Sequence, residues 1–166
     1  DCCHKMNLAL LQIGELPEFA PMIADLKAIL VYMHKSIYAA EHFNDARAAF
    51  NIKNGLTMIG ETCFSTYTWA VISVHDCLPA FYDIISKPEL GIVIDILNTH
   101  DTIEFEYNLM RFIALTSLFV KAIKCLELAY STIADVYLFW LTVVAHLADL
   151  FINNVVNLSP STIDAV

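Results

Sequence analysis

The feature that most constrains the fold is the recurrence of apolar residues at every third or fourth position over long stretches of the chain. The two clearest stretches are Phe105, Leu109, Phe112, Thr116, Phe119, Ile123 and Leu126, followed by Ile133, Val136, Trp140, Val144, Leu147 and Phe151. This period places the residues on one face of an α-helix. Paired strands would need hairpin turns flanked on both sides by alternating apolar and polar residues, and the sequence lacks such turns. We therefore expect an all-α fold.

Breaks between the periodic stretches predict how the helices are divided. The chain has only four glycines and five prolines, and they fall between the apolar stretches, as in short helix-to-helix connections. We expect a single compact domain, residues 1–166, with about five to seven helices, because this length is usual for one domain. A helix over residues 65–85 should be kinked or interrupted at Pro79. A short helix should cover residues 86–97, and Asp101 should cap the next one.

The last long helix is the most apolar part of the sequence. Thr132 and Asp135 predict a capped start, and the helix should extend to about Asn153. Because it is apolar nearly all round, we expect it to lie centrally and to be enclosed by its neighbours. Its longest uncharged run, residues 136–148, is shorter than the roughly 20 residues that a bilayer requires. We therefore expect no membrane span.

The composition indicates more apolar surface than an ordinary core would use. Hydrophobic residues make up 58% of the chain and charged residues 16%, against averages of about 45–50% and about 25%. Three interpretations remain open. The excess could serve helices buried on most sides, a surface for self-association into a homo-oligomer, or an internal pocket for an apolar small molecule.

The net charge bears on the partners of the chain, and the cysteines bear on its cellular compartment. Eighteen acidic and nine scattered basic residues give a net charge of −9, so binding of nucleic acid by this segment alone is disfavoured. The five cysteines are odd in number and widely spaced, unlike a secreted disulfide framework. No signal peptide is visible at the start. These features favour a cytoplasmic or nuclear protein with reduced thiols.

Aromatic residues and one histidine are the candidates for contacting a ligand. His146 lies inside the most apolar helix, with Thr142 one turn before it, and a buried imidazole needs a hydrogen-bond partner. It is therefore either a satisfied core histidine or a ligand contact. The full candidate set is His146, Trp140, Tyr137, Phe112 and Trp69.

Metal binding and catalysis have weaker support. Cys3 and His4, next to Cys2, are candidate metal ligands, but adjacent helical residues point about 100° apart, so a site would need distant partners. The chain contains no Gly-x-Ser-x-Gly elbow and no glycine-rich phosphate loop. The neighbours His75-Asp76 and His100-Asp101 diverge on a helix, so we expect no catalytic residue and identify no cofactor.

Several short segments resemble a known family when taken in order. They are Cys3-His4-Lys5-Met6-Asn7-Leu8, Asn54-Gly55-Leu56, Gly60-Glu61-Thr62-Cys63-Phe64-Ser65-Thr66, Cys77-Leu78-Pro79-Ala80, Ala122-Ile123-Lys124-Cys125-Leu126-Glu127 and Phe139-Trp140-Leu141. Together they resemble the all-α insertion of hAT-superfamily DNA transposases of mushroom-forming fungi. Cys63 stands where the family has arginine. The strands and the acidic triad of the family's RNase H-like catalytic core are missing, so the resemblance does not imply its chemistry.

The sequence thus favours a binding module over an enzyme. The leading hypothesis is a non-catalytic helical module from a transposase-like ancestor that self-associates or binds an apolar small molecule such as a pigment or lipid. The alternative is a fragment of a hAT-type transposase that supports DNA binding and transposition. A metal-dependent enzyme is a third class, and it would require stoichiometric metal in the purified protein.

Overall fold

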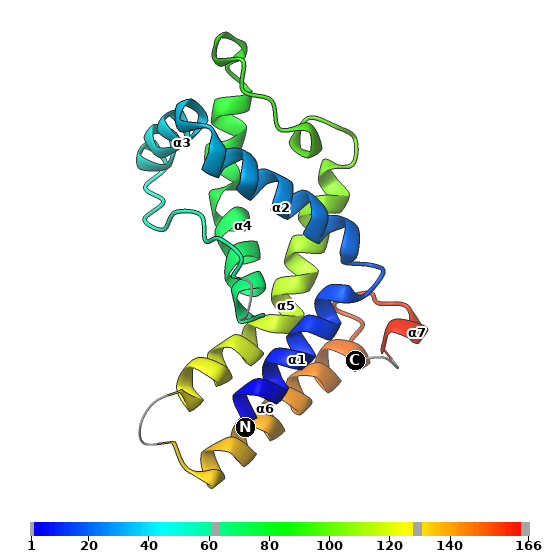
Figure 1. Ribbon diagram of the computed structural model, residues 1–166. Helices are drawn as coiled ribbons and strands as arrows, with labels where there is room; N and C mark the ends of the chain where they lie inside the picture. Colours follow the sequence, from blue (N-terminus) through cyan, green and yellow to red (C-terminus); the bar gives the residue numbers. More distant parts are fainter. Residues whose placement is uncertain (1, 61–63, 128–130, 164–166) are drawn as a thin grey trace.

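Helices account for all the regular structure in the described part of the chain. The computed structural model describes residues 2–60, 64–127 and 131–163, without the side chains of residues 161 and 162. The elements are α1 (Cys2–Glu15), α2 (Ala20–Lys35), α3 (Ile37–Ala49), α4 (Ser65–Ile85), α5 (Thr102–Leu126), α6 (Ile133–Ile152), the single turn α7 (Pro160–Ile163), and the 3-10 turns Pro88–Leu90 and Asp95–Leu97 (Figure 1). With 76% helix, the predicted all-α fold is confirmed.

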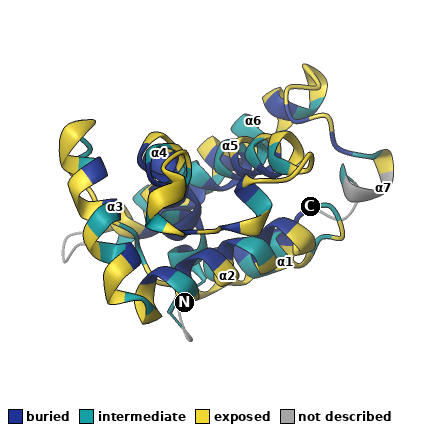
Figure 2. Cartoon of the chain, turned by 90° about the horizontal axis from the view of Figure 1, so that it is seen from above, coloured by how far each residue is buried: buried dark blue, intermediate teal, exposed yellow. Residues whose placement is uncertain are grey.

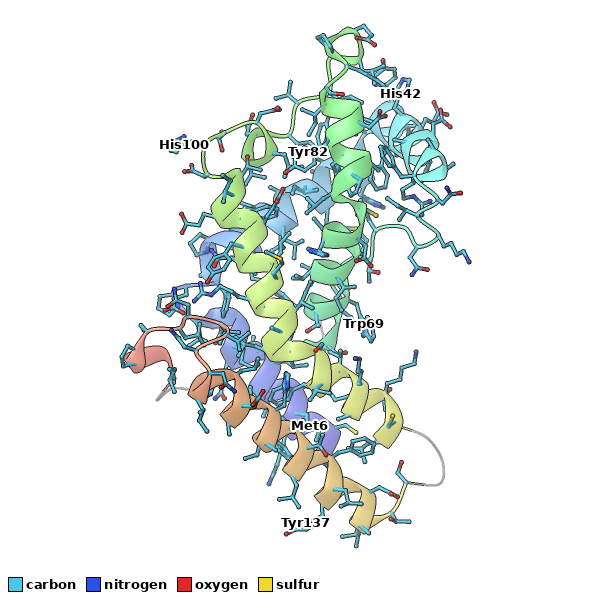
Figure 3. The ribbon with its side chains drawn as sticks, turned by 180° about the vertical axis from the view of Figure 1, so that it is seen from behind. Met6, His42, Trp69, Tyr82, His100 and Tyr137 are labelled. Carbon is cyan, nitrogen blue, oxygen red and sulfur yellow. The ribbon has the colours of Figure 1, made fainter. Side chains whose placement is uncertain are left out.

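The longest helix, α5, connects the two ends of the molecule. Helices α2 and α4 lie beside its first half, with α3 packed against α4, whereas α1 and α6 lie beside its second half (Figure 1). Figure 3 shows that α5 changes direction near its middle. The hydroxyl of Thr116, buried in this region, donates a hydrogen bond of 2.7 Å to the carbonyl of Phe112, and such bonds often bend helices. The bend directs the end of α5 toward α6.

A single core cluster takes side chains from α1 through α6. Its largest members are fully buried phenylalanines, Phe19, Phe81 and Phe112. Between α2 and α3 the chain turns at Ser36, whose backbone is extended and whose hydroxyl accepts a hydrogen bond from the amide of Ala39 at 3.1 Å. This serine cap starts a new helix directly after α2 ends at Lys35.

Two local predictions were wrong, and a third was wrong in part. Helix α4 continues through Pro79, so the predicted interruption is absent, and Pro79 itself is exposed. In place of a helix over residues 86–97 there are two 3-10 turns, separated by Gly91 with a φ of 62°. Asp101 does not cap α5 with its side chain but approaches His100 at 2.9 Å.

The predicted central position of the last helix was also wrong. The capping box of Thr132 and Asp135 forms as expected, but of the 20 residues in α6 only Val143 and Leu150 are buried. The helix lies at the edge of the molecule, against α5 (Figures 1 and 3). Most of its apolar side chains therefore face away from the core, and the predicted enclosure is absent.

Candidate functional site

The inner face of α6 is held against α1 and α5 by two polar contacts besides its apolar packing. The Nε2 atom of His146 lies 2.9 Å from the carbonyl oxygen of Ala114 in α5, which can only accept a hydrogen bond. The indole nitrogen of Trp140 donates to the Sγ atom of Cys2 in α1 at 3.0 Å. Because these two bonds lie nearly two turns apart, they set the rotation of α6 about its axis.

The opposite face of α6 is apolar and exposed. Its midline follows spacings of four, three, four, three and four residues, and we call it the α6 seam. The seam consists of Ala134, Leu138, Leu141, Ala145, Ala148 and Ile152. Leu138, Leu141 and Ile152 are 59%, 48% and 82% exposed. The spacing is that of positions a and d in a coiled coil, so the seam has the pattern of a helix that packs against another helix.

Two different flanks border the seam. On one side lie the apolar residues Tyr137 and Val144, and Tyr137 is 64% exposed and points away from the rest of the molecule (Figure 3). On the other side lie the polar residues Thr142 and Asp149, both exposed. The helix contains no lysine or arginine. Contiguous apolar surface of this kind is rare on monomers and is typical of interaction sites.

A network around Arg111 of α5 holds the chain that follows α6. Its guanidinium donates to the carbonyl oxygens of Val156 at 2.6 Å and Asn157 at 3.0 Å, and it pairs with Glu18 at 3.3 Å. Glu18 in turn accepts a hydrogen bond from the amide of Ser159 at 3.1 Å. This network ties the chain that follows α6 to α5, whereas the capping box at the start of α6 joins only Thr132 and Asp135.

The five residues predicted to contact a ligand do not come together. Phe112 is fully buried in the core, with its ring 5.4 Å from that of Phe19. Trp69 lies on α4, with the ammonium of Lys124 6.0 Å from its ring centre. His146 and Trp140 lie on the inner face of α6, and Tyr137 lies beside the seam on the outer face.

Surface cavities in the described part of the chain are lined by other residues. Four of them have volumes of about 200, 240, 300 and 310 Å³, and none of these four is lined by any of the five candidates. The largest lies between α2, the start of α4 and the segment before it. Its lining residues are Lys27, Leu30, Val31, Met58, Ile59, Gly60 and Tyr67. Its volume is at the lower limit for ligand pockets, about 300 Å³, and no motif in the sequence pointed to it.

The candidate metal ligands Cys3 and His4 are consecutive in the first turn of α1. Cys3 is half-buried and His4 is exposed. Burial raises the pKa of the Cys3 thiol, and the nearby Cys2 and Glu127 raise it further, which favours the thiol over the metal-binding thiolate. Among the described residues, no group of three or more His, Cys, Asp or Glu side chains is placed to hold a metal ion.

Residues of the first transposase-like motif have a structural role. The side-chain amide of Asn7 donates to the carbonyl of Cys3 at 3.1 Å, and its oxygen accepts a hydrogen bond from the amide of Ser65 at 3.1 Å. Met6 is fully buried in the core. The motif therefore joins α1 to the start of α4, whereas Cys63 lies outside the described residues.

The fold and site together define a helical protein that presents one exposed apolar helix face. No family model, no curated protein and no solved structure matches the chain. The resemblance to hAT transposases therefore stays a prediction. Of the described helices, only α6 is long and apolar enough to cross a membrane, judged by its length and composition.

Proposed function

We propose that this chain is a non-catalytic helical module that works by self-association through the α6 seam. The observation that carries the proposal is the orientation of α6, which packs its inner face against the protein and leaves the seam, with its coiled-coil spacing, exposed to solvent. Covering such a seam with a second helix removes apolar side chains from water, and each square ångström of apolar surface contributes roughly 25 cal/mol.

The charge of α6 favours a protein partner over a lipid surface. Helices that lie on membranes usually carry lysine and arginine beside their apolar face, and α6 has neither. The chain as a whole carries a net charge of −9, which repels anionic lipids. Crossing a bilayer would also require burying Asp135 and Asp149 or pulling them to its edges.

The shape of the seam favours a helix over a small molecule. Ligand pockets are concave and enclose most of the ligand, whereas the seam is the outer side of a single helix. The candidate ligand residues are also distributed over the core, α4 and both faces of α6. A pigment or lipid would therefore have to occupy a separate cavity, such as the one between α2 and α4, and the visible absorption spectrum of the purified protein would report it.

Sedimentation of the 166-residue chain over a concentration series tests the proposal. We expect a concentration-dependent dimer with dissociation in the micromolar range, about 1 to 100 µM. Leu141→Glu should make the chain monomeric, because it places a charge in the middle of an apolar contact.

A control variant at Ile103 is matched by exposure to a variant at Ile152, the last residue of the seam. Ile103 of α5 is 80% exposed, close to the 82% of Ile152. Ile152→Glu should weaken the dimer, and Ile103→Glu should leave it unchanged. A wild-type chain that stays monomeric at every concentration would refute self-association. The same face would then be free for another part of a longer protein, as the transposase-fragment hypothesis requires.

A further inference from the structure

From the arrangement of large and small residues on the α6 seam, we infer that α6 pairs antiparallel with α6 of a second copy of this chain, about a two-fold axis level with Val143. The inference rests on the proposed self-association and adds its geometry. The seam spacing of four, three, four, three and four residues reads the same in both directions. Two antiparallel copies can therefore bring every seam residue level with a seam residue of the partner.

The antiparallel layers match large side chains with small ones. The three kinds of layer, each present twice, pair Ala134 with Ile152, Leu138 with Ala148, and Leu141 with Ala145. Every layer then holds one alanine and one large side chain, so the two helices can keep a constant separation along their length. Alternation of large and small residues across facing positions is how close-packed contacts are filled.

A parallel pair would fit poorly. Each seam residue would face its own copy, so alanine would meet alanine at three levels and a large side chain would meet its like at the other three. The helices would be held apart at Leu138 and Leu141 and would leave gaps at Ala145 and Ala148. Gaps and overpacking both cost free energy. The two-fold antiparallel arrangement avoids both, and it is the isologous symmetry most common among homodimers.

The flanks of the seam lead to the same orientation independently. In an antiparallel helix pair, each flank meets the same flank of the partner, whereas in a parallel pair unlike flanks meet. Antiparallel pairing therefore brings the apolar flank of Tyr137 and Val144 against its copy and leaves Asp149 on the polar flank with access to water. Parallel pairing would press Asp149 against the apolar flank and strip water from a carboxylate. The layers and the apolar flank thus favour the same arrangement.

The size of the contact indicates how strong the pair should be. Helix α6 has 20 residues, which corresponds to a length of about 30 Å. A helix pair of this length buries on the order of 1,000 Å² in total, at the lower end of specific interfaces. The pair should therefore be a reversible dimer whose population depends on concentration.

A charge-pair experiment on the full chain tests the orientation. Leu138→Lys and Ala148→Asp are exposed changes in the monomer, and in the antiparallel pair they face each other across the interface. Each single variant should weaken the dimer by about tenfold or more, because its charge meets an apolar partner. The double variant L138K/A148D should recover most of that loss, to within about threefold of wild type, since both layers then pair a lysine with an aspartate.

The control keeps the same charges but moves the aspartate. In L138K/A134D, the aspartate lies one turn from the introduced lysine on the same helix and far from the partner's lysine, so the dimer should stay as weak as with Leu138→Lys alone. Circular dichroism should show the same helix content for all four variants, since none of the changed residues is buried.

The outcomes separate the two proposals. A wild-type dimer weakened equally by the double variant and by its matched control would overturn the antiparallel geometry and leave self-association intact. A wild-type dimer in which the seam variants have no effect would place the interface elsewhere and overturn both. Preferential formation of a heterodimer when the two single variants are mixed, measured by native mass spectrometry, would support the antiparallel layers directly.

Discussion

Helices α5 and α6 are both long and apolar, yet they have opposite relations to the core. Helix α5 buries ten of its 25 residues, whereas α6 buries two of its 20, although α6 carries the more apolar sequence. Helix α5 is contacted by α1, α2, α4 and α6, and the contacts of α6 are mainly with α5. Figure 2 shows that buried residues gather around α4 and α5.

The comparison shows that apolar content does not decide burial. Burial instead follows the number of elements that a helix contacts in the described part of the chain: α5 packs against four helices, whereas α6 packs mainly against α5. Helix α5 uses its apolar residues for folding. Helix α6 uses one face for folding and leaves the other exposed.

The largest expected effect is on the buried side of this comparison. Leu115→Ala removes a fully buried side chain of α5 and should lower the free energy of unfolding by about 2–5 kcal/mol, the usual cost of a cavity of this size. Chemical denaturation followed by circular dichroism would measure it, at a protein concentration low enough for the chain to be monomeric.

The matched change in α6 is Leu141→Ala. This leucine is 48% exposed, so the same truncation should change the stability of the monomer by only about 0.5 kcal/mol, as is usual for surface positions. Equal destabilisation by the two leucine variants would mean that the seam is part of the core after all.

An effect within the lower half of the range for Leu115→Ala is expected where α5 holds the chain beyond α6. Arg111→Met keeps most of the apolar stem but removes the donors to Val156 and Asn157 and leaves Glu18 without its cation. We expect a loss of about 2–3 kcal/mol, less than for a fully buried pair because part of the network is in contact with solvent. Amide exchange should accelerate first in residues 155–159. Unchanged exchange there would show that other contacts hold this segment.

The architecture could be predicted from the sequence to a large extent. The three-four periodicity of α5 and α6 and the pair Thr132 and Asp135 led directly to helices that the structure contains. The predicted interruption at Pro79 is absent, because α4 continues through the proline. The helix predicted over residues 86–97 is replaced by two 3-10 turns, because Gly91, with a φ of 62°, ends the first of them.

The site was less predictable. Periodicity identifies an apolar face but not whether the core or solvent lies beside it, so α6 was expected at the centre. His146 and Trp140 do anchor α6, and Tyr137 does border the exposed face, but no sequence pattern shows that these residues point in opposite directions. The matching of large and small residues along the seam was present in the sequence, and it acquires meaning only once that face is known to be exposed.

Trp140 tests how firmly the inner face of α6 is held. Trp140→Ala should cost about 1–2 kcal/mol, less than the roughly 3–5 kcal/mol of a fully enclosed aromatic residue, because the ring is only half-buried. The lost hydrogen bond to Cys2 is part of this cost. Thermal unfolding of the variant would measure it, and faster labelling of Cys2 by a thiol reagent should accompany it. A loss as large as that of Leu115→Ala would place α6 in the core.

The smallest expected effect concerns the different starts of the two helices. Helix α6 begins with a carboxylate cap, in which Asp135 accepts hydrogen bonds of 2.7 Å from the amide and from the hydroxyl of Thr132. These two hydrogen bonds hold the pKa of Asp135 below its ordinary value of 3.8, and the bond from the hydroxyl contributes more than the bond from the amide. The contribution of the cap is therefore fully present above pH 3.8 and is lost as the pH falls through the lowered pKa.

Helix α5 has no side-chain cap at Asp101, so acid should loosen the first turn of α6 but not that of α5. In an NMR titration from neutral to acidic pH, the amides of residues 132–136 should shift together with a midpoint below 3.8, and those of residues 102–106 should not follow them. Asp135→Asn should remove the midpoint at the start of α6, while the matched Asp101→Asn should leave it in place. If both helix starts respond to acid with the same midpoint, the cap is not what distinguishes them, and the rigid presentation of the seam must depend on the inner face of α6 alone.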